Sequence, residues 1–398
     1  MMIQAGARRN YIYARQLEQA GLLHSLVTDL AWPQQKALPL LPRLLRRSQR
    51  FSGAIARRTV MGIPAEKVMS SALPHIMRSA LGWRHAEDGL GLAYEAIAAR
   101  CKRRGLDGVQ VIVSYLDNGG SFLDYAKLRG VRIVTDFICM PNVLEIEEAE
   151  RQHWPAWGGE PIPQRVIDQF RARMRHLLSI SDIYLCPSLS VANGLSQLPE
   201  YEPSRMRLVP YGSGGYSPLG PLSEKGRVLF VGAALPRKGL PYLGLAAKIL
   251  KDQGFPVKVV VAGKVTQEVR KQPETQCLEF LGVQSREAIR SEFARADVFC
   301  LPSLTEGSSS AIFEALASGI PVVTTASSGS VIQHGVEGLV VPERDPGAIA
   351  AAIRTIIEDR EMRERMSNAA RNSLDCYSDE TVGSIFIRTI KELQETQG

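Results

Sequence analysis

Apolar residues in the second half of the chain fall into short unbroken runs, each followed by a stretch with helical periodicity. Such runs are typical of strands buried on both faces of a parallel sheet, and helices between them would complete βαβ units. The clearest helices are predicted at Leu240–Gln253 and Ser285–Ala296. Asp345 and Pro346 are a typical first turn for a third, which runs to Ile357. The predicted strands are Arg227–Gly232, Val257–Gly263, Leu278–Gly282, Val298–Pro302, Pro321–Thr325 and Gly338–Pro342.

The first half repeats this pattern less regularly, with a helix predicted over Asn10–Ala20. A stretch rich in glycine and proline, Pro210–Pro221, cannot continue a helix or a central strand, so we place the linker between the halves there. The pattern predicts an α/β protein of two doubly wound domains, residues 1–212 and 222–375, facing across a cleft that would bind the ligand. The first-half strands are predicted at Met1–Ala5, Ser25–Asp29, Val109–Ser114, Arg132–Asp136 and Ile183–Pro187.

Composition indicates the cellular compartment and shows that charge is unevenly distributed along the chain. Six scattered cysteines without CxxC spacing are typical of reduced thiols. We see no apolar signal segment and no apolar run near the ~18 residues of a membrane span, so we expect a cytoplasmic protein. Residues 1–104 carry 17 Lys and Arg against 6 Asp and Glu, a net +11, which leaves −4 of the chain's +7 for the remainder. A basic first domain favours an anionic partner; a merely solubilising surface is the alternative.

Two glutamates bracket the start of a helix predicted at about Ser309–Ser318. Glu306 lies in the loop before this helix and Glu314 about one turn inside it, with seven residues between them. Carboxylates so placed can hold a bound molecule from both ends, and the far one can accept two hydroxyls of the kind that a ribose offers. The alternative is that both are solvated and the serines only cap the helix, and the spaced pair alone favours that alternative.

The residues between the two glutamates suit a phosphate. The first amides of the helix, from Gly307 to Ala311, have no partner within the helix and point outward with the positive end of its dipole. A glycine at position 307 would let a ligand approach the backbone without a Cβ in the way.

The whole segment, LPSLTEGSSSAIFEALASGIPVV over residues 301–323, resembles the E-x7-E signature of the retaining glycosyltransferases of family four, which have the two-domain GT-B fold. The resemblance extends from about Met206 to Ile353. It implies that Glu306 hydrogen-bonds hydroxyls of the donor sugar and that Glu314 holds the nucleotide ribose. The amides implied to face the diphosphate are those of Ser308, Ser309 and Ser310, next to Gly307.

The resemblance also sets the architecture and the reaction. Two Rossmann-like domains are implied, with the terminal segment 376–398, helical over Glu380–Gln394, crossing back onto the first. The reaction is transfer of a glycosyl group from a nucleotide-sugar donor to a hydroxyl of a glycan or lipid-linked acceptor, with retention of configuration. The nucleotide sugar is a substrate, and no cofactor is implied.

Two cations follow the first strand of the second domain. Arg237 and Lys238 precede Gly239 at a strand end that faces the cleft, where they can neutralise a diphosphate and the charge that grows on it as the sugar leaves. A solvated turn is the alternative reading. The family has a lysine before the corresponding glycine, which implies that Lys238 is a diphosphate ligand. Members often have an arginine where this chain has Ala233, and Arg237 is the candidate that replaces it.

Weaker matches complete the donor site. Gly282 and Val283 follow a strand and resemble the segment whose backbone receives the base, and Ser327–Ile332 resembles the glycine turn after the next strand. Without the resemblance, both are ordinary βα turns.

The first domain departs from the family in two places. Gly6 stands where members have a glycine-rich loop facing the diphosphate, usually with two adjacent glycines; Arg8 and Arg9 follow it and either reach anionic acceptor groups or are exposed. Members often have a histidine just after the strand that corresponds to Arg132–Thr135. Here Asp136 stands near that place and either takes the acceptor proton or ends a strand.

No DxD triplet and no His, Cys and Asp cluster with metal spacing occurs, so we expect cations and a helix dipole, not a metal, to neutralise the diphosphate. Lys238, Arg237, Glu306 and Asp136 are the candidate catalytic residues. Two rivals remain: a non-catalytic nucleotide-sugar-binding subunit, which Ala233 and the missing histidine favour, and a nucleotide-sugar epimerase of similar fold. Nucleic-acid binding lacks an aromatic-interleaved basic motif.

The segment 41–58, LPRLLRRSQRFSGAIARR, predicts an arginine-rich amphipathic helix. Such a helix can lie among anionic headgroups and gain about 1 kcal/mol per basic residue; packing on its own domain is the alternative. We expect the protein to sediment with anionic vesicles, less so with added salt, and less so when Arg46, Arg47 and Arg50 become glutamate. Protein that stays in the supernatant with anionic vesicles at low salt contradicts the membrane reading.

Overall fold

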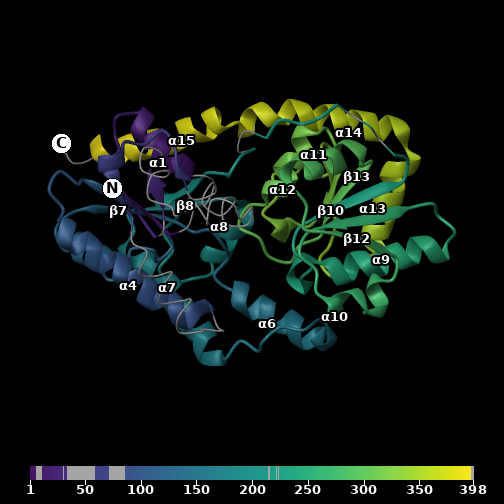
Figure 1. The fold of residues 1–398 in the computed structure, drawn as a ribbon, viewed down its shortest axis with the longest axis horizontal. Coiled ribbons are helices and arrows are strands. Elements are labelled where there is room, and N and C mark those ends of the chain that lie inside the picture. The colour runs from purple at the N-terminus through teal and green to yellow at the C-terminus, as the bar shows by residue number, and fades with distance from the viewer. Residues whose placement is uncertain are drawn as a thin grey trace, which may run out of the picture.

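Two parallel sheets, one in each half of the chain, organise the fold in the computed structural model (Figure 1). The structure describes residues 1–5, 11–29, 31–33, 59–70, 86–213, 216–220, 222 and 224–395. Neighbouring strands in each sheet run parallel, and the chain crosses between them mostly through helices. The fold class predicted from the alternating pattern, two doubly wound α/β domains, is confirmed.

The sheet of the first half has seven strands in the order β5-β2-β1-β6-β7-β8-β9. The chain reverses its direction of winding between β1 and β6, which are neighbours in the sheet although far apart in sequence. In chain order the strands are β1 Met2–Gln4, β2 Leu26–Thr28, β5 Val68–Ser70, β6 Val111–Tyr115, β7 Arg132–Asp136, β8 Ile183–Cys186 and β9 Met206–Leu208. A separate pair joins β3, Trp32–Pro33, to β4, Thr59–Val60.

The sheet of the second half has six strands in the order β12-β11-β10-β13-β14-β15. Here the winding reverses between β10 and β13, and in open α/β sheets ligands bind at the carboxyl ends of the strands beside such a reversal. The strands are β10 Arg227–Val231, β11 Lys258–Ala262, β12 Leu278–Gly282, β13 Val298–Leu301, β14 Val322–Thr324 and β15 Gly338–Val340.

Helices cover both sheets. In the first half they are α1 Ile12–Gln19, α4 Ala86–Arg104, α5 Phe122–Lys127, α6 Val143–His153, α7 Gln164–Ile180 and α8 Leu189–Leu195. In the second half they are α9 Leu240–Asp252, α10 Gln267–Arg270, α11 Arg286–Arg295, α12 Ser310–Ala317, α13 Pro346–Glu358, α14 Arg360–Ser373 and α15 Asp379–Glu395.

The central strands of the second sheet form the core that holds the candidate site. Val228, Leu229 and Phe230 of β10 are fully buried, as is every residue of β13. α9 packs against α13, and its apolar residues join the same core. Because these strands are apolar on both faces, the loops at their carboxyl ends start from fixed positions.

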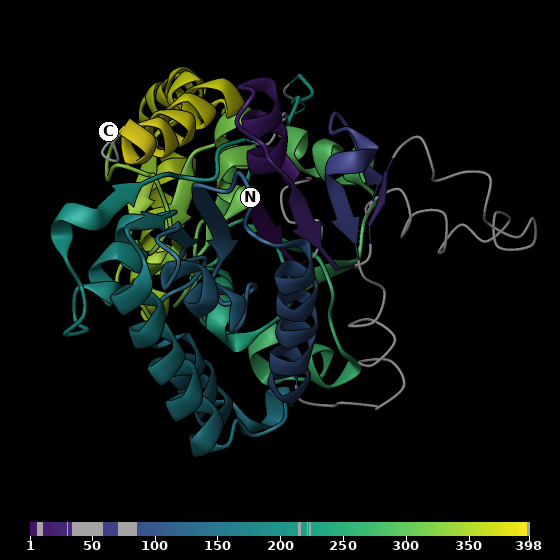
Figure 2. The same ribbon diagram turned by 90° about the vertical axis from the view of Figure 1, so that its left-hand side faces the viewer.

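The terminal helix α15 packs on α1 of the first half, and both views show it beside that helix (Figure 1 and Figure 2). The ring of Phe386 stacks on that of Tyr13 with 4.3 Å between centroids, and the Gln16 side chain donates to the carbonyl of Asp379. The chain thus returns to the first sheet after completing the second.

A second segment, from the first half, packs against the second half of the chain, and the sequence did not predict it. After β7, helix α6 and the short 3-10 helix η4, Pro155–Trp157, lie against the second half of the chain. Trp157 is 5% exposed and belongs to the same hydrophobic cluster as β10 and β13. In Figure 1, α6 lies below the two sheets, near α10.

Several sequence expectations fall outside the described residues. These are Gly6, Arg8 and Arg9 of the loop after β1, and the amphipathic segment 41–58. Among the helices that are described, none is both long and apolar enough to cross a bilayer.

Candidate functional site

The candidate site lies at the carboxyl ends of β10 and β13, where the winding of the second sheet reverses. Arg237 and Lys238 belong to η6, Pro236–Lys238, in the loop that follows β10. Glu306 lies in the loop that follows β13 and leads into α12. Residues about seventy positions apart in the chain are therefore adjacent because their strands are neighbours.

Close backbone packing fixes the loop after β10 against the loop after β13. The Leu304 amide donates to the Arg237 carbonyl at 2.8 Å. Gly239 has φ +73°, and a Cβ there would fall 1.9 Å from the Pro302 carbonyl oxygen. Only glycine therefore fits between the loops, and it holds the two cations beside the acidic residue.

Glu306 is the anionic centre of a compact cluster. Its Oε1 lies 2.5 Å from the Lys238 ammonium and 3.5 Å from Nη1 of Arg237, and the Ser303 hydroxyl approaches it at 3.4 Å. The Lys238 and Glu306 side chains are 16% and 14% exposed. Glu306 is therefore a partly buried, paired carboxylate, which excludes the alternative that it is merely solvated.

The start of α12 has no side-chain cap. Ser309 is the N-cap residue, but its side chain makes no capping hydrogen bond. The Ser308 hydroxyl oxygen is buried and has no hydrogen-bond partner within the described residues. The serines thus do not close the helix end, and backbone donors there remain available to an anion.

Gly307 has a different role from the one expected of it. A Cβ at this position would fall 1.9 Å from the Ile138 carbonyl oxygen of the first half. The space left by the missing side chain is therefore filled by first-domain backbone, so the reason for glycine is a contact between the halves. The expectation that the gap admits a ligand is wrong in this conformation.

Glu314 lies on α12 and is partly buried. Its carboxylate has no hydrogen bond or ion pair within the described part of the chain. Burial raises the pKa of Glu314 to about 7, and the nearby charge of Arg286 only partly opposes this. A desolvated carboxylate without a partner is costly to keep, as expected of a group reserved for a ligand.

The remaining predicted residues lie further from this cluster. Gly282 ends β12, the edge strand two positions from β10, and Val283 after it is 78% exposed. Asp136 ends β7, and its side chain is 1% exposed, with the Tyr211 hydroxyl donating to Oδ1 at 3.4 Å. Two residues after Asp136, the backbone carbonyl of Ile138 packs against Gly307 in the loop between β13 and α12.

Sequence reasoning missed Glu147 of α6, whose carboxylate lies 2.6 Å from Nε of Arg237. Burial raises the pKa of Glu147, against the effect of Arg237, and the charge of Glu306 adds to the rise. Nothing in the sequence near Glu147 signals this contact, because α6 belongs to the first half by chain order.

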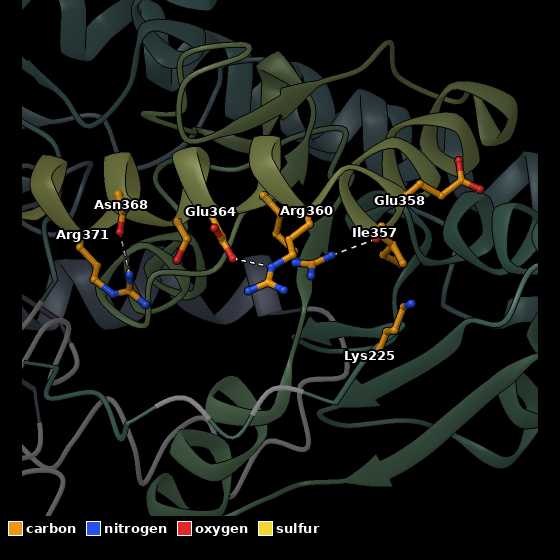
Figure 3. Close-up of a pocket in the computed structure, with 9 residues that line it drawn as sticks. Lys225, Ile357, Glu358, Arg360, Glu364, Asn368 and Arg371 are labelled. Carbon is orange, nitrogen blue, oxygen red and sulfur yellow. Dashed lines mark hydrogen bonds and ion pairs between the residues drawn. The ribbon is translucent and has the colours of Figure 1, made fainter.

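A hollow of about 710 Å³ lies elsewhere, along α14 (Figure 3). Its wall carries Lys225, Arg360 and Arg371, but Arg360 pairs with Glu364 at 2.7 Å and Arg371 donates to Asn368. None of the residues predicted for the donor site lines it. Across the described ranges, no group of three or more His, Cys, Asp or Glu side chains could hold a metal ion.

The raised pKa of Glu314 predicts how stability changes with pH. The folded pKa of about 7 exceeds the ordinary value of 4.5, so the folded state holds the proton more tightly and loses stability as pH rises from about 4.5 to 7. Glu314→Gln should therefore raise the free energy of unfolding by about 2–3 kcal/mol at pH 8 and by little at pH 4. Urea unfolding across this range tests it, with the exposed Glu287→Gln as control. A difference that does not depend on pH would contradict the desolvated carboxylate.

Comparison with known proteins agrees with this geometry. Residues 218–373 match the family described as "Glycosyl transferases group 1". The amylovoran biosynthesis glycosyltransferase AmsK of Erwinia amylovora is 34% identical over 141 residues, which is 32% of this chain and 35% of AmsK. The uncharacterized glycosyltransferase MJ1607 of Methanocaldococcus jannaschii is 29% identical over 192 residues, 45% of this chain and 48% of that protein. The chain thus spans half or less of the length of these curated relatives.

Solved structures extend the likeness in fold to nearly the whole chain. Sucrose-phosphate synthase from Thermosynechococcus elongatus has a TM-score of 0.64 at 18% identity, covering 96% of this chain and 92% of its own. HepE of Anabaena, solved in complex with UDP and glucose, has a TM-score of 0.61 at 14% identity and covers 98% of each chain. Residues 218–373, which carry Arg237, Lys238, Glu306 and Glu314, therefore match the group 1 glycosyltransferase family, in a chain with the GT-B fold.

Proposed function

We propose that this chain transfers a glycosyl group from a nucleoside diphosphate sugar to an acceptor hydroxyl. The observation that carries the proposal is the cluster of Lys238, Arg237 and Glu306 beside the open N-terminus of α12. A molecule with a diphosphate next to a sugar satisfies this cluster, because it presents anionic oxygens to the cations and hydroxyls to the carboxylate. β10 and β13 are parallel neighbours, and these groups lie at their carboxyl ends, where open α/β sheets bind ligands, which supports the proposal.

The diphosphate is the leaving group in this reaction. Lys238 and Arg237 would exchange their contacts with Glu306 for contacts with the phosphate oxygens, and the amides of Ser308, Ser309 and Ser310 would complete the cradle. Charge on the diphosphate grows as the bond to the sugar breaks, so preplaced cations stabilise the transition state more than the bound donor. We propose that this chemistry needs no metal ion.

The two carboxylates would hold the ends of the donor. Released from the cations, Glu306 would accept hydrogen bonds from sugar hydroxyls. Glu314 would accept two from the ribose, which would replace the water that its burial removes. Gly282 and Val283 would meet the base. Retention of configuration belongs to the same proposal.

The proposal for the acceptor is supported by fewer contacts in the structure than the proposal for the donor. HepE, whose fold this chain shares, holds UDP and glucose, which supports the donor class, and AmsK is named for amylovoran biosynthesis. We propose a glycan or lipid-linked acceptor, with segment 41–58 near an anionic membrane surface. Asp136 remains the candidate for the acceptor base. Because Asp136 is 1% exposed, the residues that cover it must move before an acceptor hydroxyl reaches it.

A non-catalytic nucleotide-sugar-binding subunit is the alternative that Ala233 favours. Arg237 argues against it, because its guanidinium reaches Glu306 from a position four residues later and so supplies the cation that Ala233 lacks. A binding subunit would retain nucleotide affinity without releasing nucleoside diphosphate from any donor sugar.

Lys238→Ala separates turnover from binding. We expect kcat to fall by about 10²–10³-fold, while the dissociation constant for the nucleoside diphosphate rises less than about tenfold, because the cation acts most on the leaving group. Steady-state kinetics and calorimetric titration measure the two quantities. Lys248→Ala, which removes an exposed lysine paired with Asp252 on α9, is the matched control. A variant that loses donor affinity but keeps its turnover would contradict this role.

A further inference from the structure

Helix α6 is joined to the second domain by an ion pair between the buried Glu150 carboxylate and the partly exposed Arg344, although its chain neighbours belong to the first sheet. Glu150 is 2% exposed. Its carboxylate accepts from Nε of Arg344 at 2.7 Å and from the Tyr242 hydroxyl at 2.7 Å. Both partners belong to the second half, so the buried charge is compensated across the domain boundary.

The contacts continue beyond Glu150 to the end of η4. The Trp154 indole donates to the same Tyr242 hydroxyl at 3.3 Å, and Trp157 is buried in the second domain's core. The Gln272 side chain donates to the Ala156 carbonyl at 2.9 Å. Residues 150–157 are therefore packed as part of the second domain, and α6 is held rigidly over it.

Glu147 lies one turn before Glu150 on this fixed helix and so faces the second domain. Its Oε1 lies 2.6 Å from Nε of Arg237. Nη1 of the same guanidinium approaches the Thr305 carbonyl at 3.4 Å and Glu306 at 3.5 Å. Nη2 has no hydrogen-bond partner within the described residues. Glu147 thus pairs with Nε of Arg237, and the N–H groups of Nη2 stay available to a ligand.

We propose that Glu147 is a positioning residue for the donor site: it holds Nε of Arg237 from the opposite domain and thereby aims the outer nitrogens at the place of the donor diphosphate. The inference rests on the proposed function, since it assigns Glu147 a role in that reaction. Glu147 itself touches no substrate and acts through Arg237.

A fixed orientation matters because a free arginine side chain has many rotamers. Ordering it when the donor binds would cost rotamer entropy, and a partner on Nε removes much of that cost beforehand. Glu147 is also an anion near the incoming diphosphate and opposes its binding. Its loss should therefore affect turnover more than affinity, since orientation counts most where charge develops.

Kinetics of five variants test the proposal. Glu147→Ala should lower kcat about tenfold and change the donor KM less than about threefold. Glu147→Gln keeps an oxygen within reach of Nε and should recover kcat to within about threefold of the wild type. Adding Glu147→Ala to Arg237→Ala should have no further effect, because the residue acts only through Arg237. Glu145→Ala is the control, since Glu145 pairs with Arg171 within the first half.

The outcomes separate the two proposals. Thermal unfolding of each variant shows whether a loss of kcat comes from a loss of fold. If the wild type neither binds nucleoside diphosphates nor releases them from donors, the proposed function fails. If the wild type is active but Glu147→Ala equals Glu145→Ala, or lowers kcat further when Arg237 is already alanine, the proposed function stands and the positioning role is overturned.

Discussion

The neutralisation of Glu306 by Lys238 and Arg237 is the interaction on which the site depends. A carboxylate 14% exposed and an ammonium 16% exposed are stable together, whereas either alone would be a poorly solvated charge. The pair holds the two groups close together until a ligand takes their place. An anion with neighbouring hydroxyls is the ligand that can do so without leaving a buried charge uncompensated.

The fold creates this pair by topology. β10 and β13 are adjacent because the winding of the second sheet reverses between them, and Gly239 allows their loops to touch. The first half then adds two contacts of its own, the Ile138 carbonyl against Gly307 and the Glu147 carboxylate on Arg237. The candidate site is therefore built mainly by the second domain and completed by backbone and charge from the first.

The strands and helices of the second domain could be predicted from its sequence, because the apolar runs in the sequence match the residues that the fold buries and the helix caps match the starts of helices. Unbroken apolar runs located all six strands, and Asp345 caps α13 as its sequence predicts, accepting from the Ala348 amide. The strands that went unpredicted, such as β5 and β9, have three residues each and little burial, so they carry no periodic signal. β12 shows that an edge strand can be found when its apolar run is longer.

The contacts between the halves could not be predicted, because a single sequence does not reveal which distant segments meet. Glu147, Glu150 and Trp157 lie in a stretch that reads as an ordinary first-domain helix, and only the tertiary packing shows that it belongs with the second core. The role of Gly307 was misread for the same reason. A glycine beside a phosphate-binding helix end suggests an approaching ligand, and here the approaching group is the Ile138 carbonyl.

The most direct test is to incubate the protein with a panel of nucleoside diphosphate sugars in excess EDTA, with and without lipid extract, and to measure released nucleoside diphosphate. Glu306→Gln serves as the comparison, because it keeps the shape of the side chain but removes the charge that the two cations neutralise. We predict release from one donor by the wild type, undiminished by the chelator, and its loss in Glu306→Gln. Release from no donor, or equal release by the variant, would contradict glycosyl transfer at this cluster.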